Sequence, residues 1–286
     1  MIKDILKFLS LVLVYSVLFI LANAILPFSV GFKELSSSSN PSDLIFIIIS
    51  SAWTCLLIFY IIKKSDWSEM KITLSLIGIV FFVQYFMTQI ETLFFGSAFK
   101  ALTTVDALLI VFAGLIPLLV VVPLAVKFFK NKENTGTCET LAIKELILKL
   151  ILIGFIYMVV YFIFGYFVAW QFPDLRMFYS GSTVLVSFID QLMVNFNTNP
   201  IIFPFQIFRG ILFGLAAVPL LMMFKSEKKY FITSLCLLYL TTAIVLIIPN
   251  PLFPNAVRFA HLLEMTSSMF LFAIITGLIL NKSLKK

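Results

Sequence analysis

Three residues near the C-terminal end of the chain have the types that acid–base chemistry requires. Arg258, His261 and Glu264 stand three apart in the stretch PNAVRFAHLLEMTSS, and His261 is the only histidine in the sequence. At 100° per residue, this spacing places the three side chains within an arc of about 120° on one helix face. An imidazole between a cation and a carboxylate has the composition of a tuned general base, so this face is a candidate for proton transfer.

Two further ionisable residues, Glu91 and Arg209, stand in separate apolar stretches of the sequence. An ionised group that faces lipid costs several kcal/mol, so such residues normally face the interior of a helix bundle and pair with one another. The economical arrangement joins Glu91 and Arg209 with His261 and Glu264 in one polar cavity.

We expect these residues to divide into proton carriers and substrate contacts. Glu91, His261 and Glu264 are the candidate catalytic acids and bases. A guanidinium holds a phosphate or carboxylate through two parallel hydrogen bonds, which makes Arg209 the candidate anchor for an anionic group. Further substrate contacts are expected from Gln89, and from Asp106 and Arg258 nearer the rim of the cavity.

The same residues also permit purely structural roles. Arg209 with Glu91 or Glu264 would then be a buried ion pair that fixes helix packing. Arg258 would be an anchor at the membrane interface, and His261 would have a hydrogen-bond partner in a polar core. The gathering of several ionisable groups at one depth favours the functional interpretation.

A metal site, a cofactor site and nucleic-acid binding are not predicted. His261 and Glu264 could bind one ion from one helix face with Glu91 as a third ligand, but one histidine is few for zinc, and there is no HExxH pattern. The three cysteines form no CxxC pair. No Lys/Arg-rich run contains interleaved aromatic residues, so the net charge of +7 does not indicate nucleic acid.

The elements that must position these residues are membrane helices. The chain has 286 residues, of which 61% are hydrophobic and 12% charged, whereas soluble domains are about one quarter charged. Its apolar runs are continuous and reach the roughly 20 residues that a membrane helix needs. The sequence predicts an all-α polytopic integral membrane bundle, a single transmembrane domain over 1–286. The eight expected transmembrane helices are 5–27, 43–62, 72–96, 104–127, 147–170, 200–224, 230–249 and 257–281.

The first span permits a second interpretation. Residues 1–24 combine a basic start, an apolar stretch and a small-residue end, which also describes a secretory signal peptide. The length of the apolar stretch favours an uncleaved helix. Cleavage would leave seven spans with the same orientation.

The distribution of lysine and arginine predicts the orientation in the cell membrane. With a cytoplasmic N-terminus, sixteen of the 21 Lys and Arg residues fall on the inner side and five on the outer side. Both termini and the loop 128–146 are then cytoplasmic. The segment 171–199 is extracytoplasmic, and its stretch 182–196 is expected to form a short interfacial or re-entrant helix.

Two stretches resemble known groups of proteins. FRGILFGL, residues 208–215, resembles the FRG segment of the CPBP-type (CAAX-protease-like) intramembrane proteases, but Pro204 and Phe205 stand where that motif has its glutamate pair. The stretches PNPLFPNAVRFAHLLEM and AWQFPDLRMFYSG are similar to uncharacterised bacterial polytopic membrane proteins. The second resemblance implies a membrane protein and no particular activity.

Three functions fit this description. The first is an integral membrane protein that binds or acts on an anionic lipid-like substrate, such as a lipid headgroup or a polyprenyl phosphate, in an outward-facing cavity. The second is a secondary transporter or channel. The third is a non-catalytic partner or sensor subunit, whose protein partner the sequence does not name. All three have membrane lipids as neighbours.

Overall fold

The chain is a multi-pass helical membrane protein. The computed structural model describes residues 2–36, 41–96, 99, 102–130, 143–224, 227–250 and 252–282, and every regular element in these ranges is helical. Within these ranges, eight helical segments are long and apolar enough to cross a bilayer, which confirms the predicted all-α bundle. They are α1 (Ile2–Ile25), α3 (Leu44–Lys64), α4–η2–α5 (Glu69–Phe94), α6 (Thr104–Phe129), α7 with η4 (Ile143–Gln171), α10 (Ile202–Met223), α11–α12–η5 (Lys228–Ile247) and α13 (Asn255–Asn281).

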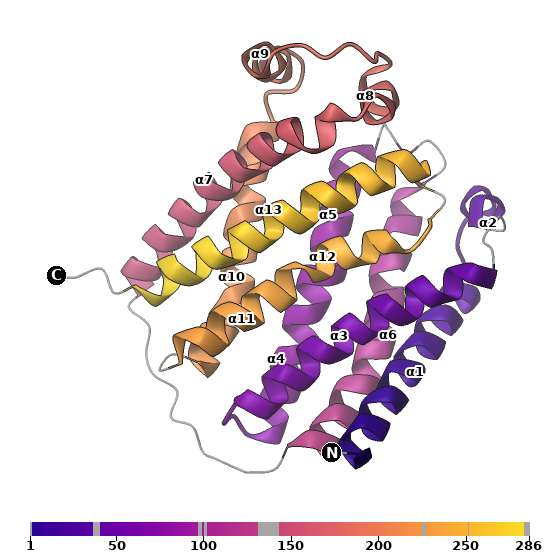
Figure 1. Ribbon diagram of the computed structural model, residues 1–286, viewed down its shortest axis with the longest axis vertical. Helices are drawn as coiled ribbons and strands as arrows, with labels where there is room; N and C mark the ends of the chain where they lie inside the picture. The colour runs from indigo at the N-terminus through magenta and orange to yellow at the C-terminus, as the bar shows by residue number, and fades with distance from the viewer. Residues whose placement is uncertain are drawn as a thin grey trace.

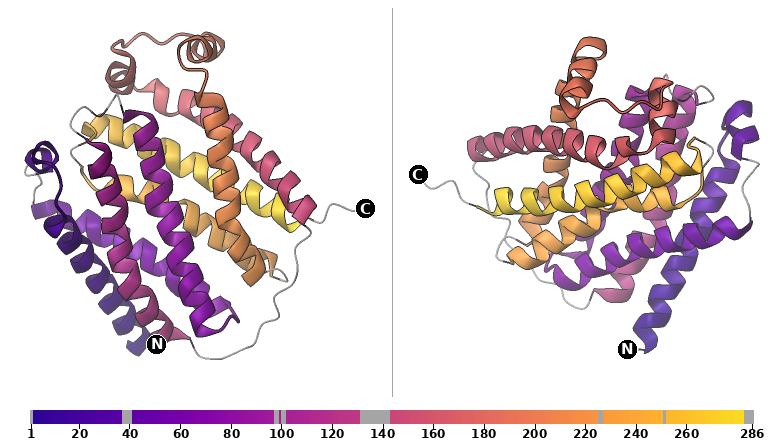
Figure 2. Two further views of the ribbon diagram at one scale, coloured as in Figure 1. Left: turned by 180° about the vertical axis from the view of Figure 1, so that it is seen from behind. Right: turned by 45° about the horizontal axis from the view of Figure 1, so that its top comes forward.

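The spans form two crossing layers. In Figure 1, α7, α13, α11 and α3 run side by side, and α10, the α4–η2–α5 span and α6 lie behind them. Figure 2 shows the second layer from its own side. Helix α1 closes one edge of the bundle, where it contacts α3 and α6 and buries Leu11, Val12 and Tyr15. The first span is therefore packed as part of the bundle.

Lysine side chains join helix ends at one face of the bundle. Lys7 of α1 donates to the carbonyl of Phe128 in α6 at 3.1 Å. Lys149 of α7 donates to the carbonyl of Leu280 in α13 at 3.2 Å. The first turns of α1 therefore lie beside the end of α6, and the first turns of α7 beside the end of α13. Because eight spans alternate in direction, the start of α1 and the end of α13 lie at the same face. That this face is cytoplasmic stays a prediction, and residues 131–142 of the predicted loop 128–146 lie outside the described ranges.

Helices α7 and α10 touch through glycine. A Cβ added at Gly210 would lie 2.8 Å from Gly154 Cα and 2.5 Å from Tyr157 Cβ. Small residues let two backbones approach closely inside a membrane, where packing replaces the hydrophobic effect as the force between helices. This contact fixes the α7–α10 pair that carries Arg209.

Two spans that were expected to be regular helices are interrupted. The third span changes from α4 (Glu69–Val80) to a π-helical turn, η2 (Phe81–Phe86), and then to α5 (Met87–Phe94). The seventh consists of α11 (Lys228–Tyr239), α12 (Thr241–Ile244) and η5 (Val245–Ile247). Interruptions of this kind often lie at functional sites, and both border the cavity described below.

Short helices cover the opposite end of the bundle. They are α2 (Val30–Ser36), α8 (Pro173–Ser180) and α9 (Phe188–Thr198), and Figure 1 shows α8 and α9 beyond the ends of α7 and α10. The sequence indicated one helix over 182–196, whereas α9 begins at Phe188. The reason is local, because the Ser187 side chain accepts a hydrogen bond from the Asp190 amide and caps the helix there.

Candidate functional site

A large cavity opens beneath the short helices. Its volume is about 1240 Å³, and its walls come from α1, α3, η2, α5, α7, α8, α9 and α13 and from the segments between them. Apolar and aromatic side chains make up most of the lining. Glu91, His261 and Glu264, the three predicted proton carriers, all lie on its wall.

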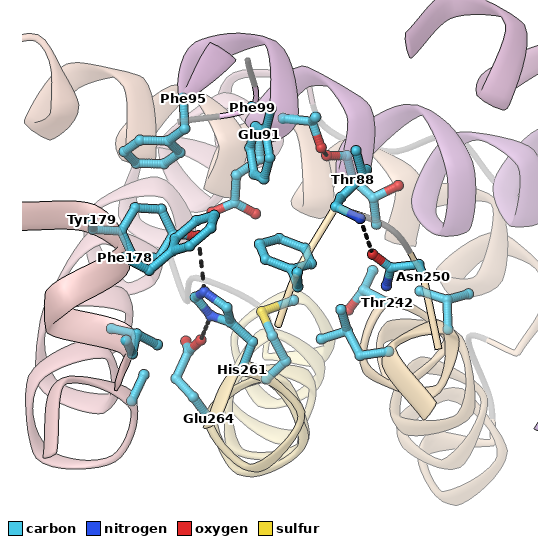
Figure 3. A pocket seen from close by; sticks show the side chains of 18 of the residues that line it. Thr88, Glu91, Phe95, Phe99, Phe178, Tyr179, Thr242, Asn250, His261 and Glu264 are labelled. Carbon is cyan, nitrogen blue, oxygen red and sulfur yellow. Dashed lines mark hydrogen bonds and ion pairs between the residues drawn. The ribbon is translucent and has the colours of Figure 1, made fainter. Parts of the chain in front are cut away.

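His261 connects a phenol to a carboxylate. Its Nε2 lies 3.0 Å from the hydroxyl of Tyr179, and its Nδ1 lies 3.4 Å from Glu264 Oε2 (Figure 3). When Glu264 accepts a hydrogen bond from Nδ1–H, Nε2 is left as an acceptor for the Tyr179 hydroxyl. We call this chain of three residues the relay. It is the arrangement by which a carboxylate sets the tautomer of an imidazole base.

Aromatic rings surround the relay. The His261 ring lies 5.7 Å from the Tyr179 ring and 5.6 Å from the Phe253 ring, centroid to centroid. Burial raises the pKa of the Tyr179 phenol above its usual value, and the charges of Glu91 and Glu264 raise it further. The Tyr179 hydroxyl therefore keeps its proton and acts as a hydrogen-bond donor.

Arg209 lies behind the cavity wall. Its Nη2 is 2.6 Å from Glu91 Oε2, and its Nη1 donates to Gln206 Oε1 at 3.0 Å. The Arg209 side chain is 1% exposed, whereas that of Glu91 is 27% exposed and faces the cavity. Tyr157 and Phe205 present their rings to the guanidinium at 5.5 and 5.8 Å. The expected pairing of Arg209 with Glu91 is present, but Arg209 itself does not line the cavity.

The position of the FRG stretch is explained by the same contacts. Phe205 stands where the protease motif has a second glutamate, and its ring stacks on Phe94 at 3.9 Å between centroids. The carboxylate beside Arg209 comes instead from Glu91, on a different span. The segment that resembles the protease motif therefore has an aromatic ring, Phe205, at the position of the second glutamate.

Asp106 and Arg258 lie away from the cavity lining and serve backbone groups. Asp106 accepts hydrogen bonds from Ser29, at 2.8 Å from its amide, and forms a capping box with Thr103 at the start of α6. Arg258 donates to the carbonyls of Leu246 and Ile247 at 2.8 and 2.7 Å, at the end of η5. Both charges satisfy the unpaired backbone groups of helix ends. Their predicted substrate contacts have no support in this geometry.

Gln89 does line the cavity, as predicted for a substrate contact. Its buried Oε1 has no hydrogen-bond partner among the described residues. This amide oxygen is therefore free to accept a hydrogen bond from a molecule in the cavity.

The sequence analysis missed Tyr179, because it considered only polar and charged groups within the spans, and Tyr179 lies outside them. Tyr179 lies on α8, a helix that begins with Pro173 and ends at Gly181, whose φ of 70° is easy for glycine. Arg176 holds this helix in place by donating to the carbonyls of Trp170 at 2.5 Å and Thr183 at 2.9 Å. The sequence signal for α8 was an aromatic stretch that starts with a proline and is followed by a glycine, a pattern typical of a short capped helix.

The ionisable groups suit proton transfer better than metal binding. Within the described ranges, no three His, Cys, Asp or Glu side chains gather closely enough to hold a metal ion. The relay has an imidazole acceptor, an oriented carboxylate and a phenol donor, which is a set of groups for accepting and returning a proton.

Comparisons of the chain with protein-family models, with curated protein sequences and with solved structures find no match. The function is therefore inferred from the cavity and the residues in it.

Proposed function

We propose that the protein binds a lipid-like amphiphile in this cavity, within the cell membrane, with the polar head of the molecule against the relay. The observation that supports the proposal most is the cavity itself. The cavity has a volume of about 1240 Å³ and mostly apolar walls. Glu91, His261 and Glu264 lie close to Tyr179 on one part of the wall. Sites for small amphiphilic molecules have this composition, since apolar walls hold the body and a few polar groups orient the head.

The charge of the polar groups favours an uncharged head. The sequence suggested an anionic one because Arg209 was expected in the cavity, but Glu91 neutralises that guanidinium at 2.6 Å. Among the described lining residues, only Lys33 and His261 are basic, and Glu264 opposes His261. Beside the relay, a phosphate would therefore meet the Glu264 carboxylate and the neutral Glu91–Arg209 pair, and no free guanidinium.

A head rich in hydroxyl groups matches these side chains. Carboxylates and the Gln89 oxygen accept hydrogen bonds, and hydroxyl groups donate them. Phe95, Phe178 and Tyr179 supply flat apolar surfaces on the same wall, where the C–H face of a sugar ring would pack. We therefore assign the ligand to the class of uncharged glycolipid-like or polyol-bearing amphiphiles, with the Tyr179 oxygen, whose own proton is donated to His261, as the acceptor for one hydroxyl.

The test compares two probes with the same alkyl chain. Binding of hexadecyl glucoside and of hexadecyl phosphate is measured on the purified protein in lipid nanodiscs. We expect the glucoside to bind about tenfold tighter or more. Glu264→Gln should lower glucoside affinity, because a neutral amide no longer sets the His261 tautomer. Glu69→Gln, an exposed site at the opposite end of the bundle, should not.

Stronger binding of hexadecyl phosphate would overturn the assignment of an uncharged head group. It would instead favour the anionic substrate that the sequence suggested. Binding of neither probe would overturn the proposed function. Native mass spectrometry of protein taken directly from membranes adds a second readout, because a retained glycolipid is identified by its mass.

A proton-coupled transporter is the second candidate, and the two interrupted spans favour it. Transporters place their sites beside broken helices, and here both η2 and the α12–η5 segment contribute to the cavity wall. The relay would then carry the coupled proton. In proteoliposomes with a pH-sensitive dye inside, a transporter would move protons only when hexadecyl glucoside is added. A binding protein would move none.

A further inference from the structure

A second polar cluster lies deeper on the cavity wall, on the side away from the relay. The hydroxyls of Tyr15 in α1 and Tyr85 in η2 are 2.6 Å apart. Gln84 Nε2 donates to the Tyr85 hydroxyl at 3.5 Å, and Gln84 Oε1 accepts from Thr54 at 3.1 Å. Tyr15, Gln84 and Tyr85 line the cavity and are otherwise buried, with exposed fractions of 2, 2 and 6%. The proposed function does not use this cluster.

The π-helical turn builds the cluster. A π turn widens the helix and leaves backbone carbonyls without their usual partners. Thr88 compensates, because its hydroxyl lies 3.1 Å from the Gln84 carbonyl and 2.8 Å from the Tyr85 carbonyl. Consecutive residues Gln84 and Tyr85 can then both face the cavity. The fold maintains an irregular helix here in order to present these two side chains.

Gly114 of α6 makes room for the Tyr85 ring. A Cβ at Gly114 would lie 2.1 Å from Tyr85 Cδ1 and 2.3 Å from Cε1, which no side chain could tolerate. The ring is therefore pressed against bare backbone on one side, and its hydroxyl is directed at Tyr15. The position of the phenol is set by packing as well as by the hydrogen bond.

Most donors of the cluster have their acceptors inside it. Two phenol protons are present, and the bond between Tyr15 and Tyr85 uses one of them. The amide of Gln84 has two N–H groups, and one of them is directed at Tyr85. The Thr54 hydroxyl also hydrogen-bonds Tyr15 and offers an acceptor for the second phenol proton. The second N–H of Gln84 has no acceptor among the described residues, and covering it with a plain hydrocarbon chain would leave this donor without a partner.

We infer that Tyr15, Tyr85 and Gln84 form a second subsite, which receives a carbonyl oxygen of an ester or amide in the bound amphiphile. The inference rests on the proposed function and adds the linkage class of the ligand to it. Seven residues separate Gln84 from Glu91, about 10 Å along the helix. The ligand would place its hydroxyl-rich head at the relay and its acyl linkage at this subsite, with the chain in the apolar remainder.

The test uses two probes that differ in one group. Hexadecyl glucoside has a methylene where 1-O-hexadecanoyl glucose has a carbonyl. In nanodiscs containing the wild-type protein, the acyl probe should bind about fivefold tighter, the difference that one net hydrogen bond makes. Tyr85→Phe should remove this preference, so that the two probes bind the variant with equal affinity. Tyr60→Phe is the matched control, because Tyr60 does not line the cavity, and it should keep the preference.

Tyr15→Phe serves as a second variant, since it removes the other phenol from a different helix, and it should have the effect of Tyr85→Phe. Equal affinity of the two probes for the wild-type protein would overturn the subsite while leaving the proposed function intact. A preference that persists in both phenylalanine variants would also overturn it. Failure of both probes to bind would instead overturn the proposed function on which the inference rests.

Discussion

The guanidinium of Arg209 in α10 and the carboxylate of Glu91 in α5 meet at 2.6 Å, although 118 residues separate them in the chain. Their environments differ, because Arg209 is almost fully buried and Glu91 borders the cavity. The pair therefore joins two spans and sets one wall of the site. It also leaves the cavity without the cation that the sequence suggested.

The unequal burial of this pair predicts unequal costs of breaking it. Glu91→Leu leaves a buried, uncompensated guanidinium and should destabilise the protein by about 3–5 kcal/mol. Arg209→Met leaves a carboxylate that water in the cavity can hydrate, so its cost should be smaller. Lys144→Ala, at an exposed site, is the control and should change little. Unfolding in detergent micelles measures all three, and equal losses for the first two variants would contradict the assigned burial.

The relay predicts a loss of binding without a loss of fold. His261→Gln keeps similar bulk and hydrogen-bonding capacity, and Tyr179→Phe removes a single hydroxyl. Both variants should unfold near the wild-type temperature and should bind hexadecyl glucoside about tenfold more weakly. Wild-type affinity in both variants would mean that His261 and Tyr179 only pack against each other.

The pKa of Tyr179 predicts how the phenol responds to alkali. Burial raises this pKa above the ordinary value of 10.0, with a further contribution from Glu91 and Glu264. Because the folded pKa exceeds the unfolded one, the contribution of this group to stability is complete below pH 10.0 and is lost as the pH rises towards the folded pKa. Folded wild-type and Tyr179→Phe proteins should therefore show the same phenolate absorbance at about pH 10. A larger absorbance in the wild type would show that Tyr179 ionises normally.

Two glycines predict opposite effects of the same substitution. Gly114→Ala forces Tyr85 to move, and overpacking of this kind typically costs about 1–3 kcal/mol. Gly78→Ala, in α4, meets nothing within 4 Å and should stabilise the protein by up to about 1 kcal/mol through helix propensity. Thermal unfolding of the two variants gives the comparison. A neutral Gly114→Ala would mean that the Tyr85 ring is not fixed against α6.

The orientation of the bundle predicts which ends react with an impermeant thiol reagent. In a background without the native cysteines, Asn199→Cys, beside α9, should react in intact cells. Ser68→Cys, between the lysine-rich ends of α3 and α4, should react only after lysis. Both sites are exposed. The reverse labelling pattern would place the cavity on the cytoplasmic side.

The spans could be predicted from the sequence because each requires only a long apolar run, whatever its neighbours. The groups at helix ends were harder to assign. Asp106 forms a capping box with Thr103, and the pattern T-x-x-D was a readable signal for that role. Arg258 caps carbonyls that belong to Leu246 and Ile247, a partnership that depends on where η5 ends and that has no pattern in the chain.

From the sequence, the site could be predicted mainly for its ionisable residues. Glu91, His261 and Glu264 share the cavity because ionised groups in a membrane must face away from lipid. Tyr179 is neutral and lies outside the spans, so that argument did not reach it. The π turn that presents Gln84 and Tyr85 packs against α6, and the pattern of apolar residues did not indicate it.

The distance in sequence between Glu91 and Arg209 also orders events during synthesis. At about 5–20 residues per second, roughly ten seconds pass between the two residues leaving the ribosome. Throughout that interval the third span, the least apolar of the eight, holds a carboxylate whose partner does not yet exist. We expect Glu91 to stay in contact with water during this interval. The arrival of α10 should then fix the third span by supplying the partner of its carboxylate.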